Sequence, residues 1–251
     1  MRDERAEMPF LDHLEELRTR LIWSMAFVGV ASVAGFFVVT ELGVIRLLEA
    51  PIRDLVPGDR LFFTNPTTPV MVTFKLSFVV GLVLAFPALV YHGWKFFAPA
   101  LYEHERKYLV PGGWAAFLLF LAGLALAYFV VLPLGLRFLL SFQADTLSPL
   151  ITIDEYLSFA TRLILVFGLI FEMPVVMVLL SLVGVVTSDG LRHYRRHAIV
   201  AMAGIAALLT PADVGTMFVM MGPMVLLYEG SVWLVRFVEG PANTTTKQIQ
   251  V

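Results

Sequence analysis

Residues 21–40 read LIWSMAFVGVASVAGFFVVT, twenty consecutive residues without a charged side chain. A helix that crosses the hydrocarbon core of a bilayer needs about 20 apolar residues. The stretch therefore predicts a membrane-spanning helix. Twenty residues of mixed charge precede it and no small-residue cleavage pattern follows it. We therefore expect a retained anchor and not a cleaved signal peptide.

The rest of the chain is as apolar as this stretch. Of its 251 residues 59% are hydrophobic and 15% charged, with a mean hydropathy of +0.82, whereas soluble domains have about 25% charged residues. Five further candidate spans follow at 70–91, 108–136, 156–188, 194–209 and 214–235. The sequence predicts an all-α membrane protein with six transmembrane helices, in which residues 210–213 allow only a tight hairpin between the last two.

The distribution of basic residues predicts the orientation. The N-terminus, the loops after the second and fourth spans and the C-terminal tail together hold twelve lysines and arginines, against five on the opposite side. Because basic loops stay in the cytoplasm, both termini are expected there. We therefore divide the chain into a cytoplasmic amphipathic segment (1–20), a six-span membrane domain (21–236) and a cytoplasmic tail (237–251).

The segment before the first span predicts an amphipathic helix, with leucines at 11, 14, 17 and 21. Glu16 falls opposite the leucines, so we expect it to be more exposed than Glu15. Two interpretations remain open. The carboxylates can be solvated charges paired as Glu15 with Arg18 and Glu16 with Arg20, or Glu16 can be an exposed carboxylate that binds a basic partner.

Two further acidic positions are candidates for function. Glu103 and Glu105 lie in an aromatic-flanked cytoplasmic loop and point to opposite faces if the loop is helical, so at most one belongs to a given site. Glu172 lies near the bilayer midplane, where an unpaired carboxylate costs several kcal/mol, and Pro174 predicts a kink beside it. Glu172 is either a functional site or a structural hydrogen-bond partner of a neighbouring helix.

Asp213 follows the turn at 210–212 and is expected to cap the last span. Glu229 lies two helical turns before Arg236, where it can be an interfacial charge. The net charge of −2 gives no field that would attract nucleic acid. The absence of cysteine excludes disulfides and thiolate chemistry, and no serine–histidine dyad or phosphate-binding glycine loop is present. We expect no cofactor, no metal and no enzymatic activity.

Four segments stand out in the chain, in this order: HLEELRTRL at 13–21, FFAPALYEHER at 96–106, FEMP at 171–174 and TPAD at 210–213. They resemble landmarks of the TatC family of the twin-arginine (Sec-independent) protein translocase. The resemblance covers nearly the whole chain. It implies a cupped six-span bundle, concave because the last two helices are short, in the bacterial cytoplasmic membrane.

The resemblance also implies a role as the receptor subunit that binds twin-arginine signal peptides of folded cargo and organises the translocation site. Implied partners are TatB-like and TatA-like single-span proteins, with the chain as a homo-oligomer inside a hetero-complex driven by the protonmotive force. Glu16 and Glu105 would bind the arginine pair, and Arg18 and Phe96 would shape that surface. Glu172 would contact a polar group of a partner helix or peptide, and Asp213 would form a turn and partner contact.

Two other classes of function remain open from the residues. A proton-coupled permease for small solutes would use Glu172 as the proton site and the Pro174 kink as a gate. A passive scaffold for other membrane subunits would bind partners but no peptide.

Overall fold

The computed structural model describes residues 10–53, 55, 61–97, 109–141, 150–209 and 214–239. Almost all of these residues are helical, and the β contact among them is one isolated bridge between Phe62 and Thr152. In chain order the helices are α1 (Phe10–Glu41), α2 (Val44–Arg53), α3 (Thr68–Phe97), α4 (Leu109–Leu126), the π-helical turn η3 (Ala127–Val131), α5 (Leu132–Ser141), α6 (Ile153–Phe171), α7 (Met173–Leu182), α8 (Ser188–His193), α9 (Arg195–Leu209) and α10 (Val214–Glu239).

The predicted all-α membrane protein is confirmed. Among the described residues, five helical segments are long and apolar enough to cross a membrane: Leu14–Glu41, Thr68–Phe96, Val110–Ser141, Ile153–Leu182 and Val214–Glu239. The remaining candidate, 194–209, corresponds to α9, which has 15 residues. A helix of that length is about 22 Å long, shorter than the bilayer core of about 30 Å. The count of six spans therefore stays a prediction.

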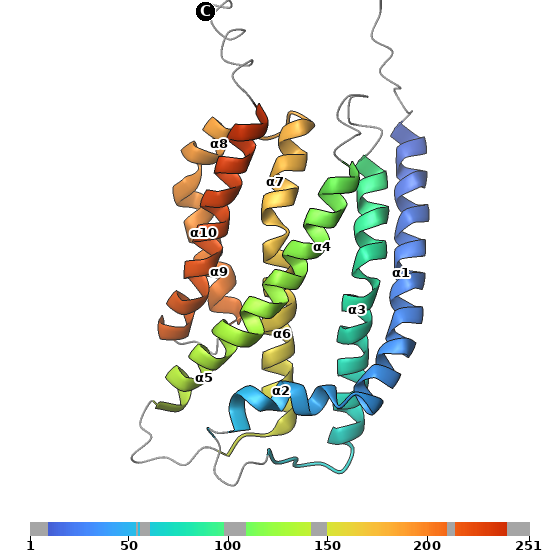
Figure 1. The fold of residues 1–251 in the computed structure, drawn as a ribbon, viewed down its shortest axis with the longest axis vertical. Helices are drawn as coiled ribbons and strands as arrows, with labels where there is room; N and C mark the ends of the chain where they lie inside the picture. The colour runs from blue at the N-terminus through green and yellow to red at the C-terminus, as the bar shows by residue number, and fades with distance from the viewer. Residues whose placement is uncertain are drawn as a thin grey trace, which may run out of the picture. The chain divides into compact units, whose positions relative to one another are not determined.

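The described residues fall into two compact units, and the first is built on α1 and α3. This unit holds the residues up to Leu47 together with Asn65–Phe117, and in it α1 and α3 run side by side (Figure 1). Small residues permit the close approach, because a Cβ on Gly81 would lie 2.6 Å from the backbone nitrogen of Ser32. Ser32 and Ser77 donate their hydroxyls to carbonyls within their own helices, so they leave no unsatisfied donor in the contact.

The second unit holds Leu48–Thr64 and the chain from Leu118 onward. In it α10 packs against α7 and α9. Two tyrosines connect distant segments of this unit. Tyr156 of α6 donates its hydroxyl to the carbonyl of Leu48 at 2.6 Å, and Tyr228 of α10 donates to the carbonyl of Leu191 at 2.6 Å. Both hydroxyls are buried with their partners, as buried polar groups in an apolar protein must be.

A π-helical turn interrupts the third predicted span. Leu132 donates its backbone N–H to the carbonyl of Ala127, five residues earlier. Pro133 follows and has no N–H to donate to residue 129. The wider turn is one of the few ways in which a helix continues past such a missing donor.

The fourth predicted span is broken where the sequence predicts a kink. Helix α6 ends at Phe171 and α7 begins at Met173, with Pro174 in its first turn. The predicted end at residue 188 is wrong, because α7 ends at Leu182. Gly184 adopts φ +80° and Val185 donates to the carbonyl of Leu180, which is the usual way a glycine ends a helix. Residue 188 instead begins α8.

The expectation that both final helices are short holds for α9 and is wrong for α10, which has 26 residues. The charged residues near its end do not stop the helix because glutamate and arginine favour helices, and two of them, Glu229 and Glu239, have partners in the same unit. Glu229 pairs with Arg195 of α9, not with Arg236. Glu239 accepts hydrogen bonds from the backbone nitrogen and the hydroxyl of Ser188.

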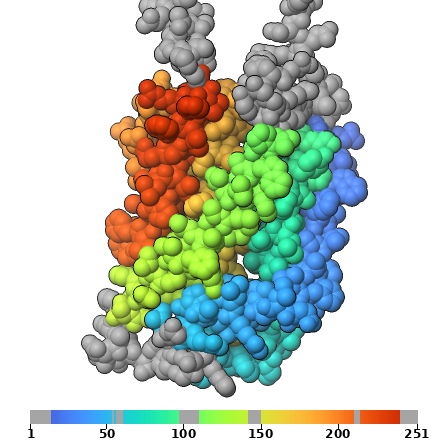
Figure 2. Space-filling view, in the orientation of Figure 1, coloured from blue at the N-terminus to red at the C-terminus, as the bar shows by residue number. Residues whose placement is uncertain are grey.

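Much of the surface of the helices is apolar. Side chains such as Phe129, Leu134 and Trp233 are 72%, 48% and 71% exposed. Leu134 lies on α5 and Trp233 on α10, and Figure 2 shows part of the surface of these helices. A surface of this kind is stable in lipid and not in water.

Candidate functional site

The structure describes four of the six candidate site residues. Glu16 and Arg18 lie in the first turns of α1, Phe96 lies in the last turn of α3, and Glu172 lies between α6 and α7. The other two candidates, Glu105 and Asp213, lie outside the described residues. The first three belong to one compact unit and Glu172 to the other.

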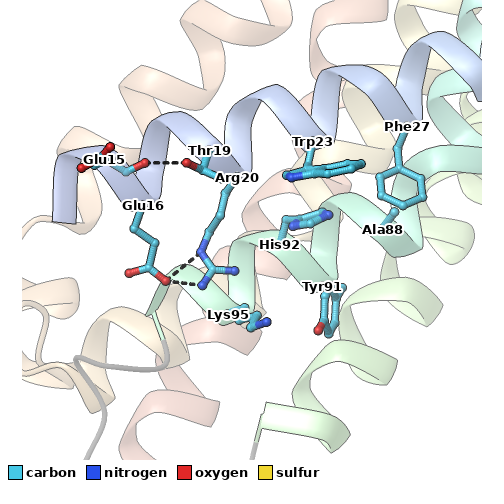
Figure 3. Close-up of a pocket in the computed structure, with 10 residues that line it drawn as sticks. All are labelled: Glu15, Glu16, Thr19, Arg20, Trp23, Phe27, Ala88, Tyr91, His92 and Lys95. Carbon is cyan, nitrogen blue, oxygen red and sulfur yellow. Dashed lines mark hydrogen bonds and ion pairs between the residues drawn. The ribbon is translucent and has the colours of Figure 1, made fainter. Parts of the chain in front are cut away.

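A pocket of about 860 Å³ lies between the N-terminal half of α1 and the C-terminal half of α3 (Figure 3). We call it the α1–α3 pocket. Its lining residues are Glu15, Glu16, Thr19, Arg20, Trp23, Phe27, Ala88, Tyr91, His92 and Lys95. All of them belong to the first unit. The pocket thus combines two acidic, two basic and four aromatic side chains.

Glu16 and Arg20 form an ion pair one helical turn apart on the wall that α1 contributes. The Nε of Arg20 donates to Oε1 of Glu16 at 3.0 Å, and Nη2 donates to the same oxygen. The two side chains are only 20% and 16% exposed, respectively. The second oxygen, Oε2 of Glu16, is buried and has no hydrogen-bond partner among the described residues. Half of this carboxylate therefore has unused acceptor capacity.

The prediction that Glu16 is the more exposed glutamate is wrong. Glu15 is exposed and Glu16 is partly buried, because the face of α1 that carries Glu16 and Arg20 is turned toward α3. The leucines at 14, 17 and 21 are 43% to 58% exposed on the rest of the helix. Of the two predicted ion pairs, Glu16 with Arg20 forms, and Glu15 with Arg18 does not form in the described structure.

Aromatic side chains line the rest of the pocket, and Trp23, Phe27 and Tyr91 are 57%, 45% and 59% exposed. The ring of His92 lies 5.7 Å from that of Phe27 and 5.5 Å from that of Tyr91. Figure 3 shows Trp23 of α1 facing His92 of α3. The Nζ of Lys95 lies 5.7 Å from the centre of the Tyr91 ring. Aromatic faces of this kind attract cations, and guanidinium groups in particular stack on them.

Carboxylate oxygens beside aromatic rings suit a ligand that is cationic, planar and rich in N–H donors. A guanidinium has five such donors and pairs with carboxylates in a fixed geometry. Arg18 is exposed and does not line the pocket, and neither does Phe96, which is half-buried. The structure therefore brings Glu16 into a pocket without these two predicted neighbours.

Sequence reasoning missed most of the pocket lining. Trp23 and Phe27 follow Arg20 at intervals of three and four residues, so helical periodicity places them on the same face of α1 as Glu16. That signal was present in the sequence. The contribution of Tyr91, His92 and Lys95 was not, because it depends on which face of α3 packs against α1.

Glu172 occupies the break between α6 and α7 in the second unit. Its backbone N–H donates to the carbonyl of Leu169, and its carbonyl accepts from Val176. The side-chain atom Oε1 is buried and has no hydrogen-bond partner among the described residues. The structural alternative, a hydrogen bond to a neighbouring helix, is thus not formed by this oxygen within the described part of the chain.

Comparisons with known proteins agree on one family. The family model described as "Sec-independent protein translocase protein (TatC)" matches residues 12–223. A protein of that name from Aquifex aeolicus is 39% identical over 246 residues, which cover 97% of this chain and 99% of the relative. One from Escherichia coli is 37% identical and covers 92% of this chain and 90% of its own.

A solved structure is similar along almost its whole length. The crystal structure of "Twin Arginine Translocase Receptor- TatC" superposes with a TM-score of 0.81 at 38% identity, covering 90% of this chain and 99% of that one. The residues matched by the family model include the α1–α3 helix pair and the break at Glu172. The chain belongs to the TatC family of Sec-independent protein translocase proteins, multi-pass membrane components of the twin-arginine translocase.

Proposed function

We propose that the protein is the receptor subunit that binds twin-arginine signal peptides of folded cargo, with the α1–α3 pocket as part of the binding site. The observation that carries this proposal is the partly buried carboxylate of Glu16, which keeps one oxygen without a partner beside aromatic rings. A carboxylate and a guanidinium make strong charge-assisted hydrogen bonds, so one arginine of the peptide has a matching acceptor.

The family resemblance adds three residues to this proposed site. Glu105 would help to bind the arginine pair, and Arg18 and Phe96 would shape the binding surface. Lysine is a weaker substitute for arginine at such a site, since an ammonium cannot pair with two acceptors in one plane or stack on a ring as a guanidinium does. The proposed site therefore selects Arg-Arg over Lys-Lys.

The wider setting is part of the same proposal. The subunit lies in the bacterial cytoplasmic membrane with both termini in the cytoplasm, so the pocket opens toward newly made cargo. It forms homo-oligomers within a complex that contains TatB-like and TatA-like single-span proteins and uses the protonmotive force. Glu172 contacts a polar group of a partner helix or of the inserted peptide, and Asp213 contributes a turn and partner contact.

Peptide binding to the purified, detergent-solubilised chain tests the proposal. A fluorescent Arg-Arg peptide is titrated at fixed salt against its Lys-Lys version, with the variants Glu16→Gln, Glu105→Gln and Glu155→Gln. Glu155 is an exposed carboxylate at the start of α6 and provides the matched control. We expect a preference for Arg-Arg that Glu16→Gln and Glu105→Gln each reduce and Glu155→Gln leaves unchanged. Equal binding of both peptides by the wild type would refute the receptor function.

A second candidate function rests on Glu172. Its unpartnered buried oxygen at a helix break also suits the proton site of a proton-coupled permease for small solutes. Liposomes that contain this chain alone would then show substrate-dependent proton uptake, abolished by Glu172→Gln. A receptor without permease activity shows no such uptake.

A further inference from the structure

Arg20 occupies the carboxylate that the proposed site offers to a peptide arginine. Two of its N–H groups donate to Oε1 of Glu16, and both side chains are mostly withdrawn from solvent. Figure 3 shows the guanidinium of Arg20 inside the pocket, between α1 and α3. In chemical terms, the chain presents its own guanidinium at the position where a ligand guanidinium would bind.

The pocket is electrically balanced in this state. Glu15 and Glu16 contribute two negative charges, and Arg20 and Lys95 contribute two positive ones. A carboxylate has about four acceptor positions, and here Oε1 is engaged while Oε2 is not. An incoming arginine must therefore share Glu16 with Arg20 or displace it.

We propose that Arg20 is an internal competitor that sets the affinity and selectivity of the α1–α3 pocket. While Arg20 holds Oε1 of Glu16, a peptide cation can form a hydrogen bond only with the remaining oxygen. The ligand must therefore gain additional binding energy by stacking on Trp23 or Tyr91. That requirement favours guanidinium over ammonium. This inference rests on the proposed function, since it concerns the same ligand and the same carboxylate.

Lys95 provides a matched control for charge alone. It lines the same pocket and carries the same charge as Arg20, but its Nζ lies over the Tyr91 ring and makes no ion pair with Glu16 in the described structure. Arg20→Gln and Lys95→Gln thus remove the same charge from the pocket. Only the first also releases Glu16.

The test measures the affinity of the purified full-length chain for the Arg-Arg and Lys-Lys peptides in wild type, Arg20→Gln, Lys95→Gln, Glu16→Gln and the double variant Glu16→Gln/Arg20→Gln. We expect Arg20→Gln to bind Arg-Arg about two- to fivefold more tightly, as expected for release of one partly exposed ion pair, and to discriminate less against Lys-Lys. Lys95→Gln should change affinity less. The double variant should bind as weakly as Glu16→Gln.

Weaker binding by Arg20→Gln, or a gain equal to that of Lys95→Gln, would overturn the inference. If Glu16→Gln leaves the affinity for the Arg-Arg peptide unchanged, the proposed function itself fails. If Glu16→Gln lowers this affinity but Arg20→Gln does not raise it, only the role of Arg20 is refuted. If Arg20→Gln does not purify as folded protein, Arg20→Lys is measured in its place. A lysine cannot hold Oε1 through two N–H groups as arginine does, so we expect a smaller increase in affinity for the Arg-Arg peptide. A decrease in this affinity would contradict the inference.

Discussion

Arg195, the first residue of α9, holds Glu229 of α10 in a two-point ion pair. The Nε of Arg195 lies 2.8 Å from Oε1 and Nη2 lies 2.8 Å from Oε2. This geometry is the bidentate one that arginine and carboxylate favour. The pair connects the short helix α9 to its longer neighbour α10 within the second unit.

Because these side chains are 47% and 41% exposed, solvent screens their attraction. We expect Glu229→Gln to lower the free energy of unfolding by less than about 1 kcal/mol. Thermal unfolding of the detergent-solubilised protein measures the change at low and high salt. The exchanged pair Arg195→Glu with Glu229→Arg should recover most of the loss, and additive effects of the two single substitutions would show that the pair contributes nothing.

Tyr156→Phe should destabilise the second unit by about 1–2 kcal/mol. The substitution removes the hydroxyl that donates to the buried carbonyl of Leu48, and a buried acceptor left without a donor costs roughly this much. Tyr194→Phe is the control, since Tyr194 is 60% exposed. The same unfolding measurement compares the two variants, and equal midpoints would contradict the stabilising role of the Tyr156 hydrogen bond.

Gly81 and Gly93 give a matched pair of substitutions in α3. A Cβ on Gly81 would run into the backbone of Ser32 in α1, whereas a Cβ on Gly93 has nothing within 4 Å. We expect Gly81→Ala to destabilise the protein by about 1–3 kcal/mol through overpacking. Gly93→Ala should be neutral or stabilising by up to about 1 kcal/mol, since alanine favours the helix. A harmless Gly81→Ala would show that α1 and α3 do not require this close contact.

Glu172→Gln should separate peptide binding from transport. Glu172 does not line the α1–α3 pocket, so the purified variant should bind the Arg-Arg peptide like the wild type. Export of a twin-arginine cargo by cells that carry the variant should fall, because the amide cannot ionise or pair as the carboxylate does. If the variant exports the cargo normally, Glu172 has no part in the proposed mechanism. If the variant no longer binds the peptide, Glu172 acts in binding and not in a later step of transport.

The positions of the spans could be predicted from the sequence, because uncharged runs of about 20 residues have few stable alternatives to a membrane helix. The break at Glu172 could be predicted as well, since Pro174 removes a backbone donor. The end of α7 before Gly184, with φ +80°, is also a local signal that the sequence carries. In contrast, Glu229 and Glu239 have partners far away in the chain, so the sequence alone does not show these contacts.

The candidate site was predicted only in part for a related reason. Helical periodicity indicates which residues of α1 share a face, but not whether that face meets solvent, lipid or another helix. The sequence predicts that Glu16 is the more exposed glutamate because it lies opposite the leucines, yet Glu16 and Arg20 are the residues that turn toward α3. The outer face of α1 is exposed in a chain that lies in lipid, so apolar side chains there need no protein partner.

Crosslinking in native membranes tests most directly whether the α1–α3 pocket receives the signal peptide. A photo-reactive phenylalanine analogue replaces Tyr91 in the pocket or, as a control, Trp233, which is 71% exposed on α10. The membranes are then illuminated with a radiolabelled cargo precursor that carries Arg-Arg or Lys-Lys. We predict an adduct at position 91 with the Arg-Arg precursor, much less with Lys-Lys and none above background at position 233. The proposed site would be contradicted if no adduct forms at position 91, or if the Arg-Arg and Lys-Lys precursors give equal amounts of it.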